Sequence, residues 1–389
     1  MTCILLPAVI GVHAQQPDPT DWSDWERYRN LDNHPCTTIT RADLQRARAN
    51  IERFEWAREY ADSVVAAADA RIAPLSPEYL ERMVPRTTPG GVGPCPACRA
   101  QGLPWHPNGQ FSWSAERPEE IVCRVCETVF PNDEYPESVE LTTDWGRGQT
   151  ISFYGGDTFR TFGYRYERPS FTGMIRRAKV GYMIGGVRTI ALAYAFTQEP
   201  RYAEAARDIL LRFAEVVPEY LVRAGYGYGE YAGTDPHVAA KHINDLPEDE
   251  MVYPPNEPDR KIYAGYWAAS RFGTNGQDGG PVGSLTEAYD LTCLAQRDGA
   301  PVYTDEQRMR IERDVLLEGS YLLACDTSIN NKSVGGRTAA ALVGLRDIAL
   351  YEGQAACELE AAAADVREGY GCVLDTAAEP WRVDTRPLF

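Results

Sequence analysis

The chain has 389 residues, of which 44% are hydrophobic, 24% charged and 11% aromatic. This is the composition of a globular protein with a large core, and the length predicts two domains or one large architecture. With 39 Lys and Arg against 56 Asp and Glu, the formal net charge is −17. That excludes a general nucleic-acid-coating role, because a phosphate backbone is bound through clustered Lys and Arg. An anionic polysaccharide in a local basic cleft stays compatible, since net charge describes the whole surface.

The first 36 residues are predicted to be a leader and a linker. An apolar run from Cys3 to Val12 gives way to polar sequence, as at the end of a secretory signal peptide. We therefore expect a signal peptide remnant at 1–14, a linker at 15–36, and a secreted or periplasmic protein. No Lys or Arg precedes Arg27, so a disordered tail is the alternative interpretation. The run is shorter than the roughly 20 apolar residues of a spanning helix, and no other stretch predicts a membrane span.

Four of the ten cysteines form two Cys-x-x-Cys pairs, which predict a structural zinc site. Cys95 and Cys98 form the first pair, and Cys123 and Cys126 follow after 24 residues. Two such turns can place four thiolates around one tetrahedral ion, which then has no open position to activate water. The alternatives are two local disulfides or a redox site. The scattered cysteines are expected to be small buried apolar residues: Cys36, Cys293, Cys325, Cys357 and Cys372.

Helical patterning begins at Thr40, a candidate N-cap. Apolar residues at three- or four-residue steps favour one long amphipathic helix from there to Ala70, so the first helices are expected within 37–73. Pro, Gly, Trp and Cys then dominate 74–157. We interpret that stretch as a Cys-rich, zinc-ribbon-like insertion with short strands, one of them at 120–122.

From 158 to 351 the pattern predicts helix pairs separated by loops. One helix is expected to end before Pro200 and the next to begin there, which makes an αα-hairpin. Further helices are expected at 285–295, 305–324 and 337–351, the second opened by a capping box at Thr304 and Gln307. Residues 220–283 are too long for a simple connection and are predicted to shape a cleft. Strands and helices do not alternate, which argues against a doubly wound sheet and a dinucleotide site.

Three stretches resemble the heparinase II/III-like superfamily of polysaccharide lyases, which includes alginate lyases. His34-Pro35-Cys36 with Thr40 to Leu44 resembles the opening before the family's first helix. Ser270 to Gly273, followed by Glu287-Ala288-Tyr289-Asp290-Leu291, is similar to its cleft loop and next helix. Asn330-Asn331-Lys332 stands where the family places an Asn motif at a helix end. Their order over residues 34 to about 346 makes the resemblance moderately specific.

The resemblance implies a mainly α fold, an incomplete (α/α) toroid of helical hairpins, that acts on uronic-acid polysaccharides by β-elimination. The proton on C5 becomes removable once hydrogen-bond donors neutralise the neighbouring carboxylate, and a Tyr or His then takes it. By the motif match Asn331 or Asn330 is the neutraliser, with Asn331 preferred, and Lys332 stands where the family has His. A helix cap or turn is the alternative for the two asparagines, and Asn331 also begins a glycosylation sequon.

The cleft loops are expected to supply substrate-binding side chains. The residues expected to bind the sugar are Tyr226, Tyr228, His237, His242, Arg271 and Asn275. A loop histidine that merely lies on the surface is the alternative for His237 and for His242. The expected partner is therefore an acidic polysaccharide or oligosaccharide, with structural zinc as cofactor.

The end of the chain departs from the family pattern. The family's catalytic Tyr follows its Asn motif by some fifty to sixty residues, and a C-terminal β-sandwich follows. Here the sequence changes character after Leu345, so 352–389 is expected to be a truncated or frame-shifted tail, the β-sandwich to be absent and activity to be in doubt. Two other functions stay open: a non-catalytic secreted carbohydrate-binding protein, and an unsaturated-uronyl hydrolase on an α/α barrel. The hydrolase requires an Asp pair, for which Asp235, Asp245 and Asp278 are available.

Overall fold

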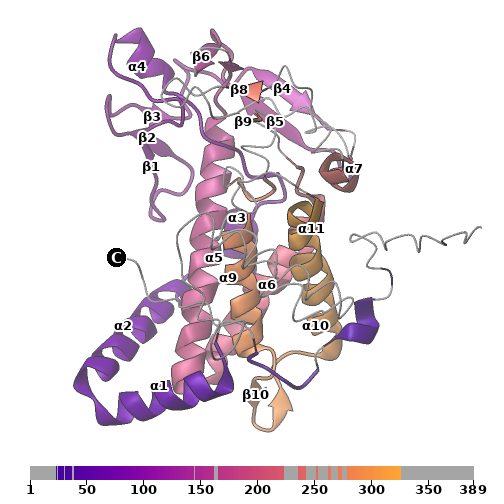
Figure 1. Cartoon of the computed structure of the whole chain (residues 1–389). Coiled ribbons are helices and arrows are strands. Elements are labelled where there is room, and N and C mark those ends of the chain that lie inside the picture. The colour runs from indigo at the N-terminus through magenta and orange to yellow at the C-terminus, as the bar shows by residue number, and fades with distance from the viewer. Residues whose placement is uncertain are drawn as a thin grey trace, which may run out of the picture.

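The computed structural model describes residues 23, 25–29, 31–36, 39–143, 145–161, 165–222, 235–241, 251–252, 262–263, 270–273 and 278–325. In this part the chain is mainly α-helical with small antiparallel sheets, as the sequence predicts (Figure 1). The helices are η1 (Trp25–Tyr28), α1 (Arg41–Arg53), α2 (Glu55–Ile72), α3 (Pro77–Met83), α4 (Pro96–Ala100), α5 (Phe171–Thr197), α6 (Pro200–Val216), η2 (Val217–Glu219), α7 (Pro236–Lys241), α9 (Gly279–Thr292), α10 (Asp305–Ile311), η4 (Glu312–Leu317) and α11 (Glu318–Cys325). The strands are β1 (Phe111–Ser112), β2 (Ile121–Cys123), β3 (Val129–Phe130), β4 (Val139–Thr142), β5 (Thr150–Phe153), β6 (Phe159–Thr161), β7 (Arg165–Glu167), β8 (Met251–Val252), β9 (Ile262–Tyr263), β10 (Gln296–Arg297) and β11 (Ala300–Pro301).

Helix α5 is the centre of the molecule and packs against α2, α6 and α9. Its N-cap is Ser170, whose hydroxyl accepts from the backbone N–H of Gly173, and it ends at Gln198, which adopts a left-handed conformation. Among the described residues it is also the one helix long and apolar enough to cross a membrane, although half of the relevant window is buried by its neighbours. Burial of that kind is typical of a core helix.

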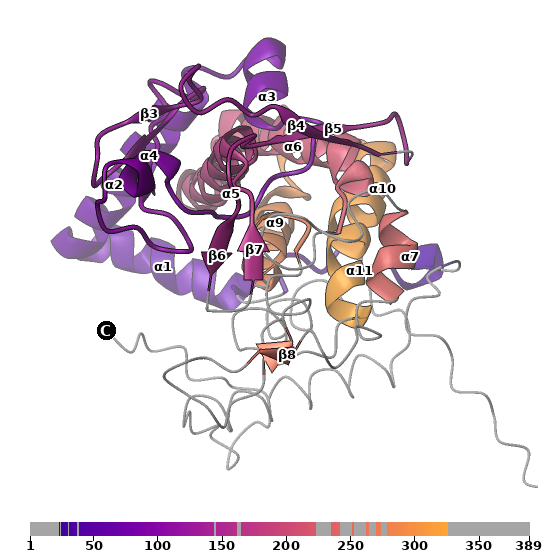
Figure 2. The same ribbon diagram turned by 90° about the horizontal axis from the view of Figure 1, so that it is seen from above.

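Helices α5 and α6 form the predicted hairpin. Gln198 closes α5, and Pro200 occupies the first position of α6, where its missing N–H costs nothing. One face of α6 is buried through Tyr202, Ile209 and Phe213, which join the main hydrophobic core. Seen from above, α5, α6 and α9 lie together, with α10 and α11 beside them (Figure 2).

The predicted single helix from Thr40 to Ala70 is wrong in one respect, because it is broken at Phe54. That residue adopts an extended conformation and separates α1 from α2. Its ring stacks on Trp56 at 6.0 Å between centroids, and the Arg53 guanidinium lies 5.0 Å from it. No Gly or Pro marks the break, so periodicity alone could not reveal it.

The Cys-rich stretch builds a separate small core at one end of α5. Strands β1, β2 and β3 form a three-stranded antiparallel sheet, and α4 lies beside it (Figure 1). The predicted strand at 120–122 is β2, shifted by one residue. The rings of Phe130 and Phe171 stack at 4.3 Å, joining this core to the first turn of α5.

The later helices follow the prediction with shifted boundaries. Helix α9 begins at Gly279, six residues before the expected start at residue 285, and both Gly279 and Gly280 are part of it. The Thr304 capping box opens α10 as predicted, and the helix continues through a π-helical stretch, η4, into α11. The expected helix at 337–351, the tail at 352–389 and the leader at 1–14 lie outside the described residues.

Candidate functional site

The four paired cysteines come together as predicted. Cys95 lies at the N-cap of α4 and Cys98 within it, while Cys123 ends β2 and Cys126 follows in the next turn. The Sγ atoms of Cys95 and Cys126 are 3.7 Å apart, and those of Cys98 and Cys123 are 3.5 Å apart. All four cysteines are free thiols in the structure, so neither Cys-x-x-Cys turn forms a local disulfide.

These distances fit a metal ion. Four sulfurs held tetrahedrally at a Zn–S distance of about 2.3 Å would lie about 3.8 Å from one another. All four Sγ atoms lie within 4.8 Å of one another, and three of the cysteines are buried. Burial raises the pKa of the Cys95 and Cys98 thiols. The cluster is thus compatible with a metal site of four thiolates.

Arg271, an expected substrate-binding residue, is buried, and its guanidinium donates to groups of the fold itself. Its Nε donates to the carbonyl of Tyr220 at 2.8 Å, and Nη2 donates to that of Val217 at 2.9 Å. Nη1 donates to the Glu318 side chain at 2.5 Å. With 1% of the side chain exposed, Arg271 cannot hold a sugar directly, and it positions Glu318 instead.

Glu318 connects Arg271 to His237, a second expected binding residue. The Nε2 atom of His237 lies 2.8 Å from Glu318 Oε2, and the imidazole stacks on Tyr321 at 4.2 Å with a 13° interplanar angle. About half of the His237 side chain is exposed, against 13% for Glu318. The structure therefore places an accessible imidazole on a buried carboxylate, and the sequence analysis did not identify Glu318.

The partners of His237 determine its tautomer. Burial alone would raise the pKa of Glu318, but Arg271 and His237 outweigh it and lower that pKa, so the group is a carboxylate that can only accept. Nε2 must therefore carry the hydrogen that Glu318 accepts. Nδ1 is then the basic nitrogen in the neutral ring, and no described residue hydrogen-bonds to it. An imidazole held in this way can take up a proton.

The remaining expected site residues lie outside the described residues: Asn330, Asn331, Lys332, Tyr226, Tyr228, His242 and Asn275. Of the three aspartates considered for a hydrolase, Asp245 also lies outside. The Asp235 carboxylate accepts from the His237 backbone N–H at 2.8 Å at the start of α7. Asp278 is fully buried and accepts from the backbone N–H groups of Arg271 and Phe272. Both described aspartates therefore stabilise backbone turns.

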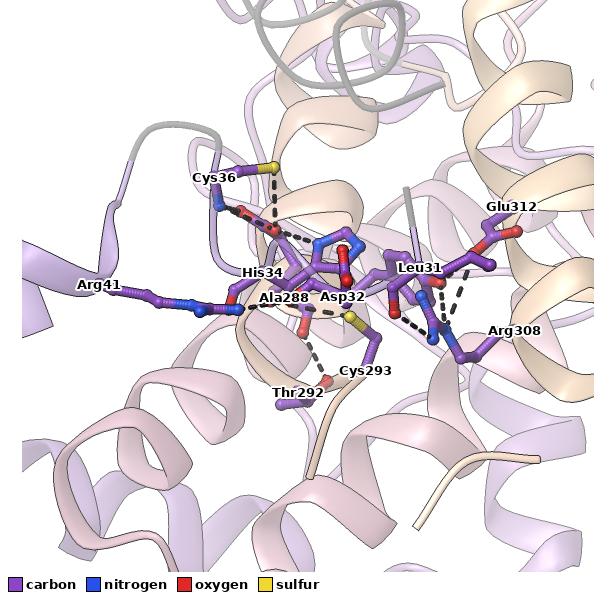
Figure 3. A network of polar contacts seen from close by, with 12 residues as sticks. Leu31, Asp32, His34, Cys36, Arg41, Ala288, Thr292, Cys293, Arg308 and Glu312 are labelled. Atoms are coloured by element: carbon purple, nitrogen blue, oxygen red, sulfur yellow. Dashed lines mark hydrogen bonds and ion pairs between the residues drawn. The ribbon is translucent and has the colours of Figure 1, made fainter. Parts of the chain in front are cut away.

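Two of the three stretches that carry the family resemblance meet in a buried network. His34 Nδ1 donates to Asp290 Oδ1 at 2.6 Å, and the Cys36 backbone N–H donates to the same carboxylate at 3.1 Å (Figure 3). Arg41 Nε donates to the His34 carbonyl at 2.8 Å. Burial lowers the pKa of His34, but the hydrogen bond to Asp290 and contacts with Cys293 and Cys36 outweigh it and raise that pKa.

This network holds the N-terminal segment on α9. The side chains of His34 and Asp290 are only 2% and 1% exposed, so no substrate reaches them. His34, Cys36 and Asp290 also offer three possible metal ligands within 4.8 Å. Hydrogen bonds already satisfy the Asp290 carboxylate, however, so a structural ion pair accounts for the cluster.

Comparison with protein-family models, with curated proteins and with solved structures finds no match for this chain.

Proposed function

We propose that this chain belongs to the heparinase II/III-like type of polysaccharide lyase and cleaves a uronic-acid-containing polysaccharide by β-elimination. The observation that carries the proposal is the accessible His237 imidazole, held by the buried Glu318 carboxylate and, through it, by Arg271. The three residues come from α7, α11 and the loop before α9. That loop belongs to the second of the three stretches that resemble the family, and the contact between His34 and Asp290 joins the first stretch to the second.

The proposed reaction needs one base and one group that neutralises the substrate carboxylate. His237 Nδ1 takes the proton from C5, and the electron pair left behind forms the C4–C5 double bond. The bond between C4 and the glycosidic oxygen breaks, and that oxygen takes a proton from a tyrosine hydroxyl or from solvent. Asn331, with Asn330 and Lys332 beside it, is the proposed neutraliser, because amide and ammonium donors stabilise the enolate that forms. The Glu318 carboxylate stabilises the positive charge that develops on His237.

We further propose that the four-cysteine cluster holds zinc and has a structural role. Sulfur-only ligation at these spacings is typical of zinc, and four ligands leave no position for substrate or water. Strands β1 to β3 with α4 then correspond to a zinc-ribbon-like insertion, and the helical pairs to part of an (α/α) toroid. Secretion or export to the periplasm is consistent with the predicted leader at 1–14.

The test is a lyase assay on the full chain with separate uronate polymers, such as polymannuronate, polygalacturonate and heparan sulfate. Cleavage is followed by the ultraviolet absorbance of the unsaturated product. We expect His237→Gln to lower kcat at least about 100-fold, the usual contribution of a positioned acid or base. The glutamine amide still donates to Glu318, so the melting temperature should stay unchanged. The exposed Glu306→Ala variant is the matched control and should retain full activity.

Four outcomes contradict or replace this proposal. Full activity in His237→Gln removes His237 as the base, and full activity in Asn331→Ala removes the proposed neutraliser. Binding of acidic oligosaccharides without any unsaturated product favours the non-catalytic carbohydrate-binding function. Consumption of an unsaturated product favours the hydrolase, although Asp235 and Asp278 both accept hydrogen bonds from backbone N–H groups.

A further inference from the structure

A cavity of about 620 Å³ lies between the Cys-rich core and α5. One wall comes from β1 and the residues beside it, including Phe111 and Trp113, and the opposite wall from the middle of α5. Phe272 and the start of α9 close one side. This volume is much larger than an inorganic ion requires and falls in the range of small-molecule sites.

The charge of the cavity is opposite to that of the whole chain. Of the described residues that line it, Arg124 and Arg177 are charged and none is Asp or Glu. In a chain with a net charge of −17, a concave surface with two arginines and no carboxylate is a local positive site. Such a site attracts anions even on an acidic protein.

Arg177 has no partner for its charge within the described part of the chain. On the same helix Lys179 donates to Glu119 and Arg188 to Glu287. Arg176 donates to the Thr88 carbonyl through Nε, and its Nη2 is buried without a hydrogen-bond partner among the described residues. No hydrogen bond or ion pair joins Arg177 to another residue among those described. Burial lowers its pKa and nothing offsets that effect. Arg177 is half-buried, so its guanidinium is available to a carboxylate or sulfate placed in the cavity.

The floor of the cavity is shaped by glycine. Gly181 and Gly185 follow Arg177 at four-residue steps on one face of α5, and a Cβ at either would meet nothing within 4 Å. Any larger side chain there would occupy the cavity. On the opposite wall the Asn108 Oδ1 atom is buried without a hydrogen-bond donor, and the Trp113 indole offers an apolar face. A site for an acidic sugar usually combines three groups: a cationic side chain, a hydrogen-bond acceptor for a hydroxyl group, and an aromatic ring.

We propose that this cavity binds one anionic sugar unit of an acidic oligosaccharide, with its carboxylate or sulfate on Arg177 and a hydroxyl group on Asn108. The site is separate from the His237 cluster, but the two flank one loop, since Arg271 holds Glu318 and the next residue, Phe272, lines the cavity. The inference draws its ligand class from the proposed function, yet it requires only binding and no cleavage.

The test is calorimetric titration of the full chain with three tetrasaccharides: tetramannuronate, a sulfated heparin tetrasaccharide and neutral cellotetraose. We expect an acidic probe to bind, cellotetraose not to bind, and Arg177→Gln to weaken the acidic probe at least tenfold. Whichever acidic probe binds more tightly identifies carboxylate or sulfate as the anion. Gly181→Leu should abolish binding by filling the cavity, and the exposed Arg310→Gln should leave it unchanged.

The melting temperature of Arg177→Gln separates a loss of binding from a loss of folding. Because its charge has no partner, Arg177→Gln should keep or raise the melting temperature, so weaker binding would not reflect unfolding. Unchanged affinity in Arg177→Gln and Gly181→Leu would overturn the proposal, as would equal binding of cellotetraose or no binding of either acidic probe. Absence of lyase activity with Arg177-dependent binding would refute the proposed reaction and leave this site standing.

Discussion

Replacing Asp290 with Ala should be among the most damaging single changes in the described part of the chain. The carboxylate accepts from His34 Nδ1 at 2.6 Å and from the Cys36 backbone N–H, and both ion-pair side chains are almost fully buried. Removing one partner of a buried pair leaves an uncompensated charge and typically costs about 3–5 kcal/mol. At roughly 2–4 °C per kcal/mol for a chain of this size class, the melting temperature should fall by about 6–20 °C.

The same pair predicts a pH dependence of stability. Folding raises the pKa of His34 above its value in the unfolded chain, because the hydrogen bond to Asp290 outweighs the effect of burial. The native state therefore keeps a proton that the unfolded chain releases above about pH 6.5. The stabilisation from this pair is complete below that pH and declines as the pH rises further.

Thermal and urea unfolding, followed by circular dichroism between pH 5 and 9, measure both effects. Asp290→Asn keeps an oxygen acceptor for His34 and Cys36 and should lose less stability than Asp290→Ala. Glu306→Ala, an exposed change, should shift the melting temperature by less than about 2 °C. If Asp290→Ala matched this control, or kept the same decline above pH 6.5 as the parent chain, the buried pair would not have the role that we assign to it.

Three further predictions concern α5 and the Cys-rich core. Cys98→Ser should reduce bound metal from one ion per chain to none, as measured by atomic emission on purified protein; one retained ion would contradict a four-cysteine site. Glu137 accepts from the backbone N–H groups of Phe171 and Thr172 at the start of α5, so Glu137→Ala should lower the free energy of unfolding by about 1–2 kcal/mol. Urea unfolding should detect this loss, and an unchanged midpoint would refute it. Gly185→Ala should raise stability by about 0.5–1 kcal/mol, because its Cβ has open space and alanine favours the helix; a lower unfolding midpoint would show that the space is occupied.

The sequence predicted those features that depend on local spacing. Each Cys-x-x-Cys turn specifies one pair of neighbouring sulfurs, so the cluster of Cys95, Cys98, Cys123 and Cys126 followed from the pattern. Pro200 after a long apolar helix fixed the α5 and α6 hairpin in the same way. Each of these signals extends over a few residues and needs no knowledge of distant contacts.

The features that the sequence missed depend on distant contacts. Arg271 lies between Ser270 and Phe272 in an irregular stretch that was expected to bind substrate. In the structure, carbonyl groups from η2 and the side chain of Glu318 enclose it. Glu318 lies 81 positions from His237 and 47 from Arg271, and no periodicity relates them. The break at Phe54 reflects the packing of its ring, since the residue itself is compatible with a helix.

The contact between His34 and Asp290 also sets an order for assembly. It joins positions 256 residues apart, and closing a flexible loop of that length costs on the order of 5 kcal/mol of chain entropy. Once α5, α6 and α9 have packed, most of that loop is already closed and the cost falls sharply. Residues 31–36 should therefore dock last during folding and be released first on unfolding, as a unit whose opening leaves the helical core intact.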